Sequence, residues 1–219
     1  MNNNLIADVN IPIIDFMIDA ILKEKALLAI KKLQGFELSS EQIECIDALF
    51  RAFNKFGIIR KRQMAYILAT AYHEAARKEK LGDDRIVFRR IVCVEEIGKG
   101  KGKRYGKKIK YSGKPYSFPD KIYFGRGLVQ ITWYELYERL GKKLGLDLIN
   151  YPEIALTPNV AAEIAVLGMR DGLFTGVGLE KYINDSKTDT INARRIINLL
   201  DSAETIQKYY KEIYSFLSK

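Results

Sequence analysis

Residues 123–132 read YFGRGLVQIT, a stretch in which an arginine stands between two glycines. Gly125 and Gly127 let the backbone approach a neighbouring segment closely or adopt a positive φ, which a bulky side chain hinders. The stretch closes a region, residues 98–127, that is rich in glycine, proline and lysine and holds short β-favouring pieces such as residues 121–124. It leads directly into a segment with helical spacing. We therefore expect a loop with a small sheet to pass into helical structure here.

Most of the remaining chain has the apolar periodicity of amphipathic helices. Ser39-Ser40-Glu41-Gln42 fits a capping box, and Thr157-Pro158 has the cap and first-turn proline of another helix start. Asp201, with Glu204 three residues later, is the expected N-cap of the last helix. The patterns predict one or two helices over residues 1–36, and further helices over residues 40–55, 61–80, 132–140, 158–169, 188–200 and 201–217.

Glu74 lies on the apolar stripe of the predicted helix 61–80, seven residues after Ile67 and three after Ala71. Apolar surroundings raise the pKa of a carboxylic acid, which can then protonate the oxygen of a breaking glycosidic bond. From position alone, the alternative is a glutamate at a helix boundary in a salt bridge. His73, the only histidine, stands next to Glu74 and is interpreted as structural, because no second histidine or cysteine cluster supports a metal.

The segment Ala69-Thr70-Ala71-Tyr72-His73-Glu74 resembles the helix that carries the general acid in glycoside hydrolase family 19, which comprises chitinases and related phage or bacterial endolysins. Residues 123–132 are similar to that family's most recognisable pattern, Y-F/Y-G-R-G-x-x-Q-I/L-S/T. The likeness covers about residues 38–217, including residues 144–148, 151–153, 172–176 and 193–198. It implies a mainly α, lysozyme-like α+β fold, with two helical lobes, a small β or irregular segment around residues 95–127, and a substrate cleft between the lobes. Residues 1–36 have no counterpart, so we expect an N-terminal helical extension at 1–36 and a catalytic domain at 37–219.

Carried over position by position, the resemblance assigns roles to single residues. Glu74 takes the place of the general acid, and the hydroxyl of Thr132 takes the place of the group that helps to hold the attacking water. Arg126 is expected to brace the site through bidentate bonds to a carboxylate. Substrate contacts are implied for Gln130, Tyr123 and Asn198, and Arg126 is counted with the substrate-binding residues as well.

The resemblance leaves the second carboxylate open. Glu96, in the acidic turn of residues 95–100, matches the family's general base best, and Glu95 is an alternative or a substrate contact. Asp83 and Asp84, about ten positions after the general acid, are further alternatives, because smaller endolysins of this type place the second acid there. A solvated acidic pair that balances nearby lysines is the plainer interpretation of Glu95 and Glu96. With Glu96 as base, the implied mechanism inverts the anomeric carbon, and the two carboxyl groups stand about 6.5–9.5 Å apart to admit a water.

One departure from the family pattern bears on the substrate. Leu136 stands before Tyr137 where many relatives have an asparagine, which implies that one sugar contact is missing. The cysteines of plant relatives are also absent. The chain's two cysteines, Cys45 and Cys93, lie in apolar surroundings without metal-ligand spacing and are expected to be reduced.

Residues 99–114, here called the basic loop, contain eight basic and no acidic side chains, together with Tyr105 and Tyr111. Such a loop can bind nucleic acid through phosphate contacts and base stacking. Its charge equally suits attraction to anionic cell-wall polymers, and a solvated surface loop is the third interpretation. The whole chain shares the bias, with 36 basic and 27 acidic side chains and a net charge of +9.

The resemblance therefore implies an endo-acting, bacteriolytic glycosidase that cuts β-1,4 bonds of peptidoglycan or chitin, and we expect a monomer without cofactor or metal. A lytic transglycosylase is a variant that needs one glutamate only. The rival classes are a wall-binding or structural protein without turnover and a nucleic-acid-binding helical protein. No stretch approaches the roughly 18 apolar residues of a membrane span, and the amino end lacks the order of a secretory signal. We expect synthesis in the cytoplasm and, for a phage-type endolysin, release to the cell wall.

Overall fold

The computed structural model describes residues 11–219, in which α-helices dominate and strands are short. The helices are α1 (Ile11–Gln34), α2 (Ser40–Lys55), α3 (Lys61–Glu74), α4 (Tyr134–Leu144), α5 (Pro158–Asp171) and α6 (Ala203–Leu217). The strands are β1 (Ala76–Lys80), β2 (Ile86–Arg90), β3 (Val94–Glu95) and β4 (Arg126–Gly127). Short 3-10 helices cover Arg104–Lys107, Pro152–Leu156, Leu179–Lys181 and Asn192–Ile196. The expected mainly α class is confirmed.

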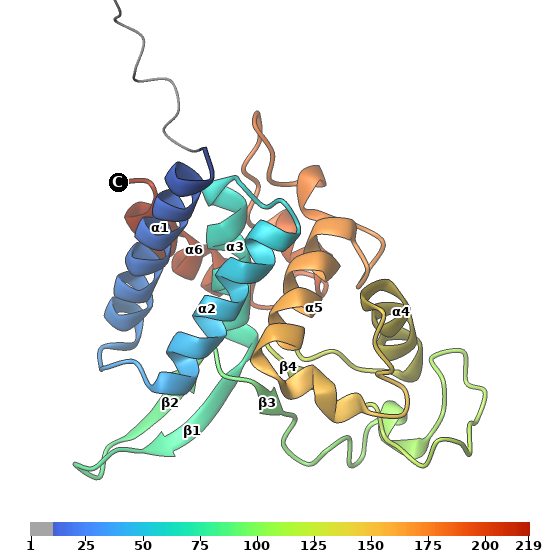
Figure 1. The fold of residues 1–219 in the computed structure, drawn as a ribbon. Coiled ribbons are helices and arrows are strands. Elements are labelled where there is room, and N and C mark those ends of the chain that lie inside the picture. The colour runs from blue at the N-terminus through green and yellow to red at the C-terminus, as the bar shows by residue number, and fades with distance from the viewer. Residues whose placement is uncertain (1–10) are drawn as a thin grey trace, which may run out of the picture.

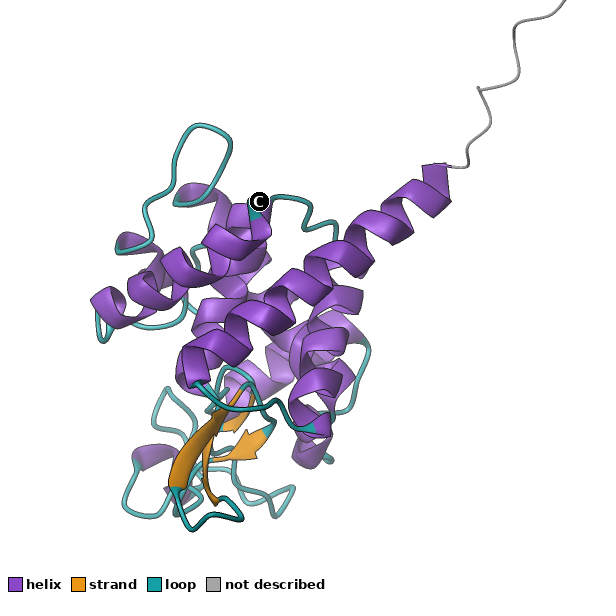
Figure 2. Cartoon of the chain, turned by 90° about the vertical axis from the view of Figure 1, so that its left-hand side faces the viewer, coloured by secondary structure: helices purple, strands orange, loops and turns teal. Residues whose placement is uncertain are grey.

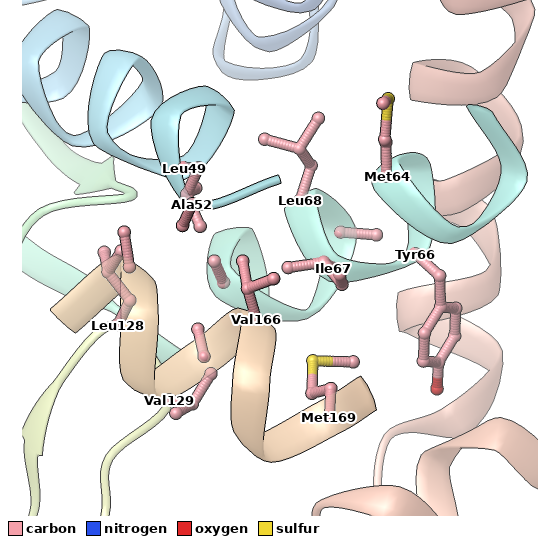
Figure 3. Close-up of a cluster of buried hydrophobic side chains, with 14 of the residues drawn as sticks. Leu49, Ala52, Met64, Tyr66, Ile67, Leu68, Leu128, Val129, Val166 and Met169 are labelled. Atoms are coloured by element: carbon pink, nitrogen blue, oxygen red, sulfur yellow. The ribbon is translucent and has the colours of Figure 1, made fainter. Parts of the chain in front are cut away.

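Helix α3 lies at the centre of the fold. Every residue from Gln63 to Tyr72 is buried, as a helix with neighbours on all sides requires. Figure 3 shows Ile67 and Leu68 of this helix among side chains from α2, α5 and the stretch after β4. Because α3 is packed all round, its C-terminal residue, Glu74, has a fixed place relative to these neighbours.

The other helices surround this centre. Helices α1 and α6 lie side by side at one side of the molecule, α2 packs against α5, and α4 lies at the opposite side from α1 (Figure 1). The strands gather together at one end (Figure 2). Strands β1 and β2 form an antiparallel hairpin that pairs Ala76 with Arg90 and Lys80 with Ile86, while β3 pairs with β4.

The capping box predicted for α2 is present. The Ser39 hydroxyl accepts from the Gln42 amide at 3.3 Å, and the Gln42 side chain accepts from the Ser39 amide at 3.1 Å. The helix predicted over residues 61–80, however, ends at Glu74. Residues 76–80 pair with residues 86–90 instead, and the Arg89 guanidinium joins Glu79 across the hairpin at 2.6 Å. Pairing with the next strand of the chain thus overrides the helical periodicity.

The helix predicted over residues 188–200 is wrong, since only Asn192–Ile196 form a 3-10 helix. The Asp189 carboxylate accepts from the Asn192 amide at 3.1 Å and closes a tight turn that competes with an α-helix. Asp201 is also not the cap of the last helix: Ser202 is the N-cap, with a φ of 58° and no side-chain cap bond.

The predicted N-terminal extension is one helix, α1, over its described part; residues 1–10 lie outside the described residues. Leu22, Ala26 and Ile30 of α1 are buried in the same core as the other helices. The division of the chain at residue 36 stays a prediction. Within residues 11–219, no helix is both long and apolar enough to span a bilayer.

Candidate active site

A cleft of about 810 Å³ opens between the C-terminal end of α3 and helix α4. Segments far apart in the sequence contribute to it, including the basic loop and the stretch that links β4 to α4. The residues that line it are Glu74, Tyr111, Ser112, residues 129–133, Glu135, Leu136, Arg139, residues 174–176, Ile197 and Asn198. Glu74 therefore opens onto a groove, as expected for a general acid.

The Glu74 side chain is 18% exposed and is held by an ion pair. Its Oε1 accepts a hydrogen bond from Nη1 of Arg194, whose side chain is only 2% exposed. The Nε of Arg194 donates to the carbonyl of Asp201 at 2.8 Å. The surroundings of Glu74 are not apolar as predicted at its carboxylate, because a buried guanidinium holds it. Glu74 fits both sequence interpretations, since it forms a salt bridge at a helix end and also lines a cleft.

His73 adjoins this pair and lies near the ring of Tyr209, at 6.4 Å between centroids. Burial lowers the pKa of His73 below its ordinary value, so the imidazole is neutral near pH 7. The residue packs beside the site without lining the cleft, in keeping with a structural role.

Thr132, Gln130 and Asn198 all line the cleft with Glu74. The Gln130 side-chain amide donates to the carbonyls of Val94, at 2.9 Å, and Gly127, at 3.2 Å. Gln130 therefore holds the turn that presents Thr132 to the cleft. The structure brings these predicted residues together.

Glu96 is fixed to the stretch 123–132. Its Oε2 accepts from the Gly125 amide at 3.0 Å, and its own amide donates to the Gly125 carbonyl at 2.7 Å. A Cβ at position 125 would lie 2.7 Å from Oε1 of Gln130 and 3.2 Å from Cβ of Glu96, so a larger residue here would displace the Gln130 side chain. Glu96 thus lies close to Gln130, which lines the cleft, although Glu96 itself does not line it.

Tyr105 from the basic loop completes the contacts of Glu96. Its hydroxyl donates to Oε1 of Glu96 at 2.8 Å. Burial, together with this bond, raises the pKa of Tyr105 well above its ordinary value, so the phenol remains a hydrogen-bond donor. Both oxygens of the Glu96 carboxylate therefore have donors.

The other acidic candidates lie elsewhere. Glu95 contacts Nζ of Lys99 at 2.6 Å and Nε of Arg126 at 3.6 Å. Asp83 and Asp84 lie in the turn of the β1–β2 hairpin, where Asp83 contacts Arg85 and Asp84 contacts Lys80. None of these three carboxylates lines the cleft.

Tyr123 does not take the predicted role of a substrate contact. Its side chain is fully buried, and its hydroxyl donates to the carbonyl of Ile149 at 2.8 Å. Tyr123 supports the stretch 123–132 from inside the core and does not reach the cleft.

Arg126 braces this stretch differently from the prediction. Its Nη1 donates to the Ile122 carbonyl and the Tyr137 hydroxyl, both at 3.1 Å, and its guanidinium lies 3.6 Å from the centroid of the Phe124 ring. A single contact to Glu95 at 3.6 Å replaces the expected bidentate pair. Gly127, with a φ of 81°, supplies the positive φ that the sequence predicted.

The basic loop is folded onto the edge of the cleft. Gly106 packs against the backbone of Gly100, where a Cβ would lie 2.0 Å from the carbonyl oxygen. The loop carries Tyr111 and Ser112 into the cleft lining. A loop that contributes side chains to the cleft is more than a solvated surface segment.

The chitinase class I model of glycoside hydrolase family 19 matches residues 20–169. The chain belongs to this family. A bacterial family 19 chitinase of known structure superposes with a TM-score of 0.60 at 19% identity, over 90% of this chain and 92% of that chain. A chitinase C mutant superposes with a TM-score of 0.51 at 18% identity, over 80% and 83%. The lysozyme-like fold of family 19 is confirmed.

Curated relatives of this family 19 chain differ in their stated activity. An endochitinase of Arabidopsis thaliana is 32% identical over 130 residues, which are 56% of this chain and 38% of the relative. An inactive endochitinase of the same plant is 34% identical over 142 residues, which are 60% and 45%. The chain spans less than half the length of these two relatives. The chain is about equally identical to a relative named as an endochitinase and to one named as inactive, so family 19 includes both kinds of protein.

Two charged side chains of this family 19 site were not predicted from the sequence. Arg194 stands 120 positions after Glu74, and only the fold brings them together. Glu135 lines the cleft, and its Oε2 is enclosed without a hydrogen-bond partner in the described part of the chain. The sequence does carry a signal that could have identified Glu135: it lies four residues before Arg139, so both side chains are on one face of the helix. In residues 11–219, no group of three or more histidine, cysteine or acidic side chains could hold a metal ion.

Proposed function

We propose that this chain is an endo-acting, inverting glycosidase that hydrolyses β-1,4 bonds of an N-acetylhexosamine polymer, chitin or peptidoglycan. The observation that carries the proposal is the carboxylate of Glu74 at the wall of a cleft that Thr132 and Asn198 also line. The endochitinase names of relatives support a chitin-type substrate. The charge of the basic loop beside the cleft supports an anionic wall polymer, as an endolysin released from the cytoplasm would meet.

In the proposed mechanism, Glu74 gives its proton to the departing glycosidic oxygen. The guanidinium of Arg194 then stabilises the carboxylate that this transfer leaves behind. Glu96 takes a proton from a water on the opposite face of the sugar, and the hydroxyl of Thr132 helps to hold that water. Among the acidic candidates, Glu96 is favoured because it contacts Gly125, in the same stretch 123–132 that carries Thr132.

The test compares the unsubstituted protein with Glu74→Gln on N-acetylglucosamine hexamers and on purified peptidoglycan. Loss of a general acid lowers kcat about 10²–10⁴-fold, whereas glycan binding measured by calorimetry remains. Glu138→Gln is the matched control, because Glu138 lies on α4 outside the cleft lining and pairs with Lys142 at 3.4 Å. Turnover that survives in Glu74→Gln would refute the assignment of the acid.

The products separate the mechanisms. Inversion yields the α-anomer first, which NMR of fresh digests detects, and wall fragments carry ordinary reducing ends. Fragments lighter by one water would instead indicate a lytic transglycosylase.

A second candidate function is a glycan-binding protein without turnover. It is favoured by the inactive relative of similar identity and by the two hydrogen bonds that already occupy the Glu96 carboxylate. Binding of hexamers by the unsubstituted protein without any product would support this candidate.

A further inference from the structure

Trp133 is the only tryptophan of the chain, and it lines the same cleft as Glu74. It occupies the N-cap position of α4 with a φ of 73° and makes no side-chain cap bond. Small polar residues are favoured at this position, and a bulky residue at positive φ is rare and strained. Neither capping nor backbone conformation favours a tryptophan here, and what distinguishes the residue is the place of its ring at the cleft wall.

Side chains of the basic loop surround this ring. The Tyr105 ring lies 5.6 Å from it at 74°, and the Tyr111 ring lies 5.2 Å from it at 82°, measured between centroids and ring planes. The Arg104 guanidinium lies 5.6 Å from the indole centroid. Tyr111 is 70% exposed and lines the cleft as well. Trp133 and Tyr111 thus form two nearly perpendicular aromatic rings at the cleft wall, here called the aromatic corner.

We propose that the aromatic corner is a sugar-binding site, at which one hexosamine ring of the polymer packs its C–H face on the exposed ring of Tyr111 and an edge against Trp133. This inference rests on the proposed function and assigns the residues that hold the chain of sugars beside Glu74. Aromatic faces carry partial negative charge and bury much apolar surface, so they match the C–H face of a pyranose ring. Ligand clefts typically combine such faces with a few polar groups.

A nucleic acid base could in principle stack on the same rings while the lysines contact phosphates. The polar neighbours favour a sugar. Glu135 lines the cleft, and its carboxylate accepts hydrogen bonds from hydroxyl and acetamido N–H groups, whereas it would repel a row of phosphates. Ser112 and Thr132 add uncharged partners for sugar hydroxyls.

The experiment uses the emission of Trp133, which reports on the site directly because the chain has no other tryptophan. The full chain with Glu74→Gln is titrated with N-acetylglucosamine hexamer, and binding is measured in parallel by calorimetry. We expect a saturable change in emission with the same midpoint as the heat of binding. Tyr111→Ala should weaken binding about five- to tenfold. Tyr151→Ala is the matched control, since Tyr151 is 55% exposed and lies outside the cleft lining, and its affinity should stay within about twofold.

Each failure has a distinct meaning. The sugar-binding role of the aromatic corner is refuted if hexamer binds with heat but without a change in emission, or if Tyr111→Ala binds with unchanged affinity. The proposed function still stands in either case if the unsubstituted chain turns over substrate. Absence of both turnover and hexamer binding overturns the two together. Tighter binding of oligothymidylate than of hexamer, seen in the same emission, would overturn the sugar assignment in favour of nucleic acid.

Discussion

Substitution of Arg194 by methionine, which is of comparable length and uncharged, removes the buried partner of Glu74. It breaks the charged hydrogen bond to Oε1 of Glu74 and leaves the Asp201 carbonyl without its 2.8 Å bond from Nε. A hydrogen bond to a charged group contributes about 1.5–3 kcal/mol and a neutral one about 1 kcal/mol. The sum is a loss of about 2.5–4 kcal/mol in the free energy of unfolding. Because Glu74 is 18% exposed, water replaces part of the lost contact, and we expect about 3 kcal/mol.

Urea unfolding followed by circular dichroism measures this loss, provided that the dependence on urea is unchanged between variants. Arg195→Met is the matched control, because Arg195 is exposed and adjacent, and it should stay within about 0.5 kcal/mol. The double variant Glu74→Gln with Arg194→Met tests the pair itself: the two effects should fall short of additivity by about 1–2 kcal/mol. A loss below about 1 kcal/mol for Arg194→Met, or strict additivity, would refute the view that the pair fixes the acid.

Three further changes test other parts of the site. Tyr105→Phe removes only the hydroxyl that donates to Glu96, so kcat on hexamers should fall about tenfold with KM nearly unchanged. An unaltered kcat would show that Tyr105 does not assist Glu96 as the base. Burial lowers the pKa of His73, the only histidine, so the unfolded chain binds more protons below about pH 6.5. The free energy of unfolding should therefore rise from about pH 5.5 to about pH 7, and His73→Gln should lose that part of the slope. The sulfurs of Cys45 and Cys93 lie 3.7 Å apart, and their hydrogen bond together with burial raises the pKa of Cys93. A thiol reagent should thus react slowly at Cys93 in the folded protein and fully in urea, and fast reaction in the folded protein would contradict this.

Helix starts with explicit caps could be predicted from the sequence, whereas helix ends set by strand pairing could not. The capping box at Ser39 and the first-turn proline Pro158 are local signals, and α2 and α5 begin where these signals indicate. The end of α3 has no local signal of comparable strength. Residues 76–80 leave the helix because residues 86–90 pair with them, a choice that depends on both strands at once.

Some residues of the candidate site could likewise be predicted from local patterns in the sequence, and others could not. Glu74, Thr132 and Gln130 could be predicted to share a cleft because they stand in recognisable segments. Tyr123 belongs to the same stretch but points into the core, and no pattern in the sequence distinguishes these two directions. Arg194 could not be paired with Glu74, because the contact exists only once the last third of the chain has packed against α3.

The two proposed catalytic carboxylates are held by different kinds of structure. Glu74 ends a helix whose residues from Gln63 to Tyr72 are all buried, so a change in the core that shifts the acid should also lower stability. Glu96 is held by Gly125 and by Tyr105, which belongs to a glycine-rich loop at the surface. Substitutions in the basic loop can therefore alter the proposed base and the aromatic corner without loss of core packing. The basic loop contacts the proposed base through Tyr105 and the proposed sugar site through Tyr111. Its fold, and not only its charge, therefore fixes the position of a bound sugar relative to the base that activates water.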